Sequence, residues 1–218
     1  MTAICEWQPQ NREGRGTSFE PLLIESYRMI IEGLCTTTNA DGSMNIAPMG
    51  PIVDAEFSSI LLRPFQSSTT FQNLAREKCG VFHVVDDVLQ LARTALGEKP
   101  EHVETFSATK VSGKVLANAC RWFEFEVTSI NADQPRSEIT TRVVHEGTLH
   151  NWSGFNRAKH AVIEATILCT RLHILPAEEI DAVWPFLASA VEKTGGPAER
   201  EAFEFVSNYL NEYRRSQQ

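Results

Sequence analysis

The sequence predicts a mainly β protein (β+α), in which an antiparallel β barrel is followed by three C-terminal helices. In the first 150 residues, short apolar runs of strand-like composition alternate with turn residues, and few helical patterns interrupt them. After Trp152 the apolar residues recur at helical spacing, and prolines and glycines divide this region into three helices. We therefore divide the chain into a flexible N-terminal arm (1–20), a barrel domain (21–150) and a helical extension (151–218).

The composition is that of a globular protein with a sizeable core. The chain has 218 residues, of which 42% are hydrophobic and 22% are charged. The net charge of -8 argues against a basic surface for nucleic acid or for an anionic membrane. No run approaches the ~20 apolar residues of a membrane span, and the first residues lack the apolar core of a signal peptide. We expect a cytoplasmic protein that binds neither nucleic acid nor membranes.

The cysteines and histidines predict no metal site. The five cysteines are scattered and form no CxxC pair, which favours buried thiols in a reducing compartment over a zinc site or a disulfide framework. His145 and His150 flank Glu146 without the helical HExxH arrangement of a zinc site.

The expected strands alternate with turn signals. Asp41-Gly42 suits a tight hairpin between two of them. Glu124 and Glu126 share one face of a later strand, which we expect to face solvent. In chain order the expected strands are Leu22–Ile24, Met29–Thr37, Met44–Met49, Ile60–Leu62, Val81–Val85, Ala108–Leu116, Trp122–Ile130 and Arg142–Glu146.

Capping residues mark the expected helices. Hydroxyl residues open a helix at 67–76, and Asp86-Asp87 can cap a second at 88–96. Ser153 can cap the first C-terminal helix, and Pro176 and Pro197 open the next two.

A loop after the strand Ile60–Leu62 has the composition of a phosphate site. Arg63 ends the strand, hydroxyl residues follow, and a helix begins, so that N–H groups, hydroxyls and a cation meet. Asn73 lies early enough in this helix to face the same ligand. A simple helix cap followed by a polar turn is the alternative. The hydroxyl residues are Ser67, Ser68, Thr69 and Thr70.

A second segment could contact a flat heterocycle. Pro48 removes a ladder donor and Gly50 permits close approach of the backbone, so this strand end is expected at a sheet edge or bulge. Its exposed backbone groups could bind the edge of a ring, and a strand that ends in a Pro/Gly turn is the alternative. The segment comprises Asn45, Ile46, Ala47, Pro48, Met49 and Gly50.

These motifs, TTTNADGSMNIAPMG, LLRPFQSSTTFQNL and VFHVVDDVLQLARTAL, occur in an order that resembles the flavin-reductase-like FMN-binding split-barrel superfamily. More narrowly, the chain resembles a domain-of-unknown-function family of FMN-binding archaeal and bacterial proteins. The resemblance implies a six-stranded antiparallel split barrel that forms a homodimer with FMN at the interface. It implies phosphate contacts from Arg63, 67–70 and Asn73, a flavin ring along 45–50, and His83 near the same cavity.

Two further residues have competing interpretations. His83 lies in an apolar strand, where a structural histidine with satisfied hydrogen bonds is the alternative to a cofactor contact. Arg157, in a basic cluster with Lys159 and His160, could reach the phosphate from across the site, and a solvated helix face is the alternative.

The resemblance implies a flavin-dependent oxidoreductase that uses a nicotinamide donor or another small substrate. FMN would carry the hydride, so no protein nucleophile is required. A non-catalytic flavin-binding or storage module, or a partner-binding protein, is the alternative. Split-barrel oxidases of pyridoxal phosphate usually have a basic pair in the phosphate loop where this chain has hydroxyls, so that activity is not implied.

Overall fold

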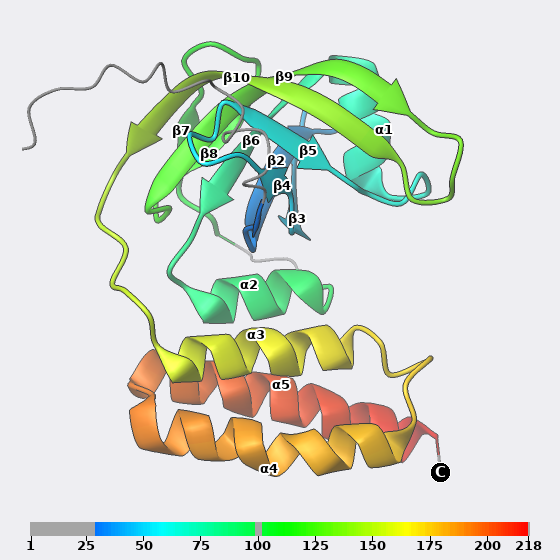
Figure 1. Cartoon of the computed structure of the whole chain (residues 1–218), viewed down its shortest axis with the longest axis vertical. Coiled ribbons are helices and arrows are strands. Elements are labelled where there is room, and N and C mark those ends of the chain that lie inside the picture. The colour runs from blue at the N-terminus through cyan, green and yellow to red at the C-terminus, as the bar shows by residue number, and fades with distance from the viewer. Residues whose placement is uncertain (1–28, 99–101, 218) are drawn as a thin grey trace, which may run out of the picture.

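A curled antiparallel sheet lies above a layer of helices in the computed structural model, which describes residues 29–98 and 102–217 (Figure 1). The expected arm (1–20) and the expected strand Leu22–Ile24 lie outside these residues. Among the described helices, none is long and apolar enough to cross a membrane.

The main sheet has eight strands in the order β1-β4-β5-β10-β9-β6-β2-β3, where the resemblance implied six. All its neighbouring strands are antiparallel. A second, two-stranded sheet pairs β7 with β8. The strands are β1 (Met29–Ile30), β2 (Gly33–Thr38), β3 (Met44–Met49), β4 (Ile52–Val53), β5 (Ser59–Leu62), β6 (Cys79–Val84), β7 (Thr105–Ser107), β8 (Lys114–Leu116), β9 (Arg121–Asn131) and β10 (Glu138–Thr148).

Two short connections force the main sheet to curl. β3 lies at one end of the strand order and β4 next to the other end, yet only Gly50 and Pro51 join them. Three Cα–Cα steps span at most about 11 Å, so the two ends of the sheet must approach each other. Ile31 and Glu32 join β1 to β2 across the same gap, and the N–H of Ile31 donates to the carbonyl of Pro51 at 3.2 Å. The result is a split-barrel-like half barrel. Its end strands, β1 and β3, are not paired with each other, and the two short connections join the ends instead.

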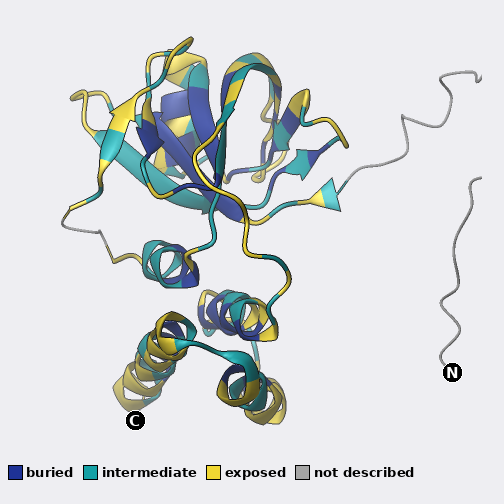
Figure 2. Cartoon of the chain, turned by 90° about the vertical axis from the view of Figure 1, so that its left-hand side faces the viewer, coloured by how far each residue is buried: buried dark blue, intermediate teal, exposed yellow. Residues whose placement is uncertain are grey.

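The interior of the half barrel is apolar and is closed by a helix. Helix α1 (Thr69–Glu77) contributes Leu74, which packs among strand residues such as Phe82, Phe123 and Phe125. All four side chains are fully buried. Figure 2 shows this buried interior beneath an exposed rim.

The helices form a second core. Helices α3 (Arg157–Cys169), α4 (Ala177–Thr194) and α5 (Pro197–Ser216) pack together, and α2 (Val88–Ala95) from the barrel region joins them. Val88 and Ala92 of α2 belong to the same apolar cluster as Ala161, Val206 and Leu210. Helix α2 therefore links the sheet to the C-terminal helices.

Several expected elements are confirmed and others are corrected. β3 has the expected bounds, Gly42 in the preceding turn has a φ of 82°, and Ser68 caps α1. The expected strand Met29–Thr37 is wrong as one element, because the chain crosses the open side of the sheet at 31–32. The expected strand Ala108–Leu116 is wrong over its first six residues, because 108–113 form the loop between β7 and β8 and only 114–116 are a strand.

The junction between sheet and helices contains a partly buried ion pair. Lys159 Nζ of α3 lies 2.6 Å from Asp86 Oδ1 after β6 and donates to Ser153 Oγ at 2.9 Å. Ser153 therefore does not cap α3 as expected; Asn156 does, through bonds to two backbone N–H groups. Asp87 alone caps α2.

The expectation that Glu124 faces solvent is wrong. Its side chain is fully buried, and its carboxylate accepts backbone N–H groups from Thr109 at 2.8 Å, from Lys110 and from Val111. Trp122 Nε1 adds a donor at 3.3 Å. Burial alone would raise the pKa of Glu124, but these donors together hold it below the ordinary 4.5. Glu124 thus holds the 108–113 loop against β9.

We predict that Glu124→Gln lowers the free energy of unfolding by about 2–3 kcal/mol at neutral pH, because an amide cannot accept all these donors. A carboxylate with a depressed folded pKa stabilises above its unfolded pKa and loses this contribution as pH falls through the folded value. The variant should therefore lose less stability than the wild type as the solution is acidified below about pH 4.5. Urea unfolding across this range measures both effects.

Glu126→Gln is the matched control, because Glu126 is exposed on the same strand and, within residues 29–98 and 102–217, forms an ion pair with Arg142 alone. It should change stability by no more than about 1 kcal/mol. Equal effects of the two substitutions would contradict the role assigned to Glu124.

Candidate functional site

The loop between β5 and α1 is built around the cap of α1. Ser68 Oγ accepts the N–H of Phe71 at 3.2 Å and donates to the carbonyl of Phe65 at 2.7 Å. The side chains of Ser67 and Thr69 are exposed, and the first turn of α1 contains no acidic residue. The positive end of the helix dipole is therefore left uncompensated by its own sequence.

The hairpin that joins β9 to β10 fixes this loop from the other side. Ser137 donates to the carbonyl of Pro64 through both its N–H, at 3.0 Å, and its hydroxyl, at 2.8 Å. Gln66 Nε2 donates to the carbonyls of Ala132 and Gln134 at 2.7 and 2.8 Å. The loop is held in one conformation although the two segments are far apart in sequence.

Two arginines that form no ion pair within the described part of the chain lie at this loop. Arg63 Nε is buried, and no hydrogen-bond partner for it exists among the described residues. Arg136, from the β9–β10 hairpin, donates through Nε to the carbonyl of Arg63 at 3.0 Å. Its guanidinium lies 5.3 Å from the ring centroid of Phe65. Sequence reasoning missed Arg136, since nothing local indicates that the hairpin reaches this loop.

The second candidate segment lies on the edge of the sheet, as expected. β3 pairs only with β2 among the described strands, so one side of its backbone has no ladder partner. Pro48, which has no N–H, is tolerated there. Residues 44–50 are all partly exposed, and a Cβ at Gly50 would come within 2.9 Å of a carboxylate oxygen of Glu32.

A polar contact joins the two segments. Asn45 Nδ2 of β3 lies 3.3 Å from Thr70 Oγ1 of α1 and 3.2 Å from Thr37 Oγ1 of β2. Thr70 is buried. The start of α1 is thereby fixed to the edge strand.

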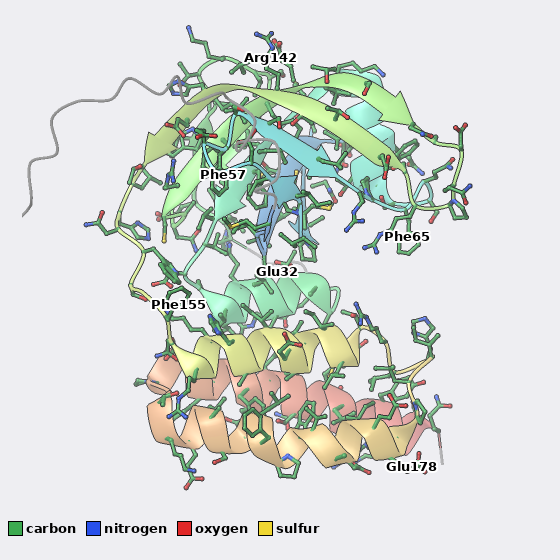
Figure 3. All side chains as sticks on the ribbon, in the orientation of Figure 1. Glu32, Phe57, Phe65, Arg142, Phe155 and Glu178 are labelled. Carbon is green, nitrogen blue, oxygen red and sulfur yellow. The ribbon has the colours of Figure 1, made fainter. Side chains whose placement is uncertain are left out.

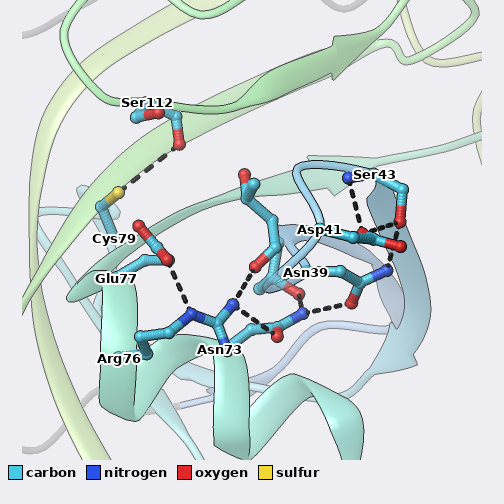
Figure 4. A network of polar contacts seen from close by, with 10 residues as sticks. Asn39, Asp41, Ser43, Asn73, Arg76, Glu77, Cys79 and Ser112 are labelled. Atoms are coloured by element: carbon cyan, nitrogen blue, oxygen red, sulfur yellow. Dashed lines mark hydrogen bonds and ion pairs between the residues drawn. The ribbon is translucent and has the colours of Figure 1, made fainter.

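Asn73 completes this network on the next turn of α1 (Figure 4). Its Nδ2 donates to Thr37 Oγ1 at 3.0 Å and to Asn39 Oδ1 at 2.8 Å, and its Oδ1 accepts from Arg76 at 2.9 Å. Asn73 is 2% exposed, so its amide is used to attach α1 to the β2–β3 hairpin.

His83 has the environment of a structural histidine, which was the alternative to a cofactor contact. The side chain is fully buried, Nδ1 lies 3.1 Å from the carbonyl of Leu34, and Nε2 accepts the N–H of Leu116 at 3.1 Å. Burial lowers the pKa of His83 to about 4, against the opposing bond to Leu34. The ring is neutral with its proton on Nδ1, and both nitrogens are occupied by the protein.

Within one chain, Arg157 is not brought to the loop before α1. Phe155, two residues before Arg157, and Phe65 in the loop lie at opposite sides of the molecule (Figure 3). Arg157 instead lines a groove of about 320 Å³ between α3 and α4, together with His160, Phe186 and Lys193.

The fold and this site define a split-barrel-like β+α protein with a loop suited to an anion. The chain belongs to the DUF447 family, described as proteins of unknown function. The family's N-terminal domain matches residues 31–150, and a second DUF447 region matches residues 156–208. No curated protein sequence matches the chain significantly.

A solved structure shares this architecture. An FMN-bound DUF447 protein of Methanosarcina mazei aligns with a TM-score of 0.71 and 24% identity, over 87% of this chain and 100% of its own. At this identity the match establishes the fold. Much weaker matches include the 2-nitrobenzoate 2-nitroreductase of Pseudomonas fluorescens, with a TM-score of 0.48, 17% identity and coverages of 58% and 68%. The styrene monooxygenase flavin reductase of Pseudomonas putida aligns with a TM-score of 0.46 and 12% identity, over 57% of this chain and 83% of its own.

We predict that Asn73→Ala lowers the free energy of unfolding by about 1–3 kcal/mol, because it removes from a buried position the amide that donates to Thr37 Oγ1 and Asn39 Oδ1 and accepts from Arg76. Urea denaturation measures this loss. Gln72→Ala, at an exposed position on the same helix, should change stability by less than about 0.5 kcal/mol. A loss no greater than that of Gln72→Ala would show that the network does not hold α1.

Proposed function

We propose that the protein binds FMN, with the phosphate at the loop before α1 and the flavin ring along 45–50, and that it acts as a flavin-dependent oxidoreductase. The carrying observation is the contact between Asn45 and Thr70, which joins a phosphate-suited helix start to an unpaired strand edge. The FMN-bound relative from Methanosarcina mazei supports the choice of flavin.

The residues at the loop fit a phosphate. Arg63 has a buried guanidinium nitrogen without a partner, and the hydroxyls of Ser67 and Thr69 have no bonds within the described residues. The N–H groups at the start of α1 add donors in a positive field. Ser68, Thr70 and Asn73 serve chiefly to shape and attach this helix start, since their side chains bond within the protein.

The edge strand fits a ring. Backbone groups of 45–50 supply donors and acceptors at fixed spacing, while Ala47 and Met49 offer apolar contact. When bound, FMN would supply hydride chemistry, and this chain would orient it and exclude water. No acid, base or nucleophile of the protein is required for that role.

A second copy of the chain would complete this site. The free edge of β3 has no strand partner among the described residues, and the Phe65 ring beside the loop is 56% exposed. A homodimer with FMN at its interface would bury both features and could bring Arg157 of one copy toward the loop of the other. Analytical ultracentrifugation with and without FMN tests this arrangement.

The absorption spectrum of the purified protein tests the main proposal. Bound flavin gives a band near ~450 nm. A colourless protein that takes up no added FMN would refute flavin binding. Rapid bleaching of the bound flavin by NADH or NADPH under anaerobic conditions would support an oxidoreductase. Binding without reduction by any donor would leave a storage module as the better description.

We predict that Arg63→Ala combined with Thr69→Ala weakens FMN binding by about tenfold or more, because each charge-assisted bond contributes about 1.5–3 kcal/mol. Fluorescence titration with FMN measures the change. Arg142→Ala is the control. Arg142 is an exposed residue of β10 that pairs with Glu126 of β9, so its loss should leave the affinity for FMN unchanged. Unchanged affinity in the double variant would place the phosphate elsewhere, with Arg157 the next candidate.

A further inference from the structure

We propose that Arg136 makes this site selective for a terminal phosphomonoester, so that FMN binds in preference to riboflavin and FAD. The inference rests on the proposed function and assigns the choice among flavins to one side chain outside the phosphate loop. Arg136 reaches the loop from the β9–β10 hairpin, 73 residues after Arg63.

Three contacts fix the position of Arg136. A β-bridge pairs its backbone with that of Phe65, Nε donates to the carbonyl of Arg63, and the guanidinium lies over the Phe65 ring. Only one of the five N–H donors of the guanidinium is used by these contacts. The other donors remain available for a ligand.

The charges around the loop favour an anion. Neither Arg63 nor Arg136 has a carboxylate within 4.0 Å among the described residues, whereas Arg142, Arg121 and Arg214 form ion pairs. The first turn of α1 is free of acidic residues. In a chain of net charge -8, two arginines that the described residues leave without ion pairs, beside a positive helix end, are a local concentration of positive charge.

The number of charges explains the selectivity. A phosphomonoester carries a charge of about -1.5 to -2 at neutral pH and offers three acceptor oxygens. It can therefore be bound by Arg63 and Arg136 together. Riboflavin has no phosphate, and the flavin-side phosphate of FAD is a diester with a single charge and a bulky substituent. FMN alone among the three places up to two negative charges on the single phosphate that the two arginines would share.

The Phe65 ring lowers the cost of using Arg136. A free arginine side chain loses much of its rotamer entropy when it is fixed. Here the ring and the Nε bond already hold the guanidinium, so little further order is lost when the phosphate binds. Phe65 is a positioning residue in this scheme.

The test compares FMN and riboflavin binding to the flavin-free full chain by fluorescence titration. Arg136→Gln should weaken FMN binding by about tenfold and leave riboflavin within about twofold, because only the phosphate contact is lost. Arg136→Lys should recover part of the loss, since it keeps the charge without the fork. Phe65→Leu should weaken FMN binding by about threefold, again without affecting riboflavin. Arg142→Gln, at an exposed site on β10, is the control for loss of one positive charge.

The outcomes separate this inference from the proposed function. If the wild type binds neither flavin, the proposed function fails. If the wild type binds FMN but Arg136→Gln matches Arg142→Gln, the inference is overturned while FMN binding stands. Equal weakening of FMN and riboflavin also overturns it, because the loop would then have been disturbed as a whole. If riboflavin binds too weakly to measure, FMN affinities of the three arginine variants decide, with circular dichroism confirming that each is folded.

Discussion

Covalent closure of the sheet is the constraint on which the rest of the structure depends. Two connections of two residues each, 31–32 and 50–51, cross the gap between the ends of the strand order. Chain connectivity therefore imposes curvature that hydrogen bonds alone would not. The irregular register between β9 and β10, at Thr140/Thr141 and Val143/His145, accommodates the curl, since bulges bend a strand and increase its twist.

Strand pairing brings distant segments to one place. The antiparallel pairing of β5 with β10 sets the β9–β10 hairpin against the loop after β5, and the strand order leaves β3 as a free edge beside the start of α1. The polar network through Thr37, Asn45 and Asn73 then fixes the helix to the hairpin of β2 and β3. Each part of the candidate site is supplied by a different segment, and none of them forms it alone.

Local chemistry made part of this predictable. The Asp41-Gly42 turn and the hydroxyl cap at Ser68 are short-range signals, so β3 and α1 could be located from sequence. Arg136 could not, because its position depends on pairing between segments about seventy residues apart. Alternation placed Glu124 on the outer face of β9 correctly, but alternation cannot show that a loop with three N–H donors covers that face.

Helix α2 gives the chain an architecture that its two family regions do not suggest. It lies within residues 31–150, yet Val88 and Ala92 belong to the apolar core of the helices that follow. A boundary drawn near residue 150 therefore cuts through a hydrophobic core. We therefore expect that the two regions cannot be exchanged between proteins as independent domains. A barrel separated from its helices would expose the apolar face of α2 and would be prone to aggregation.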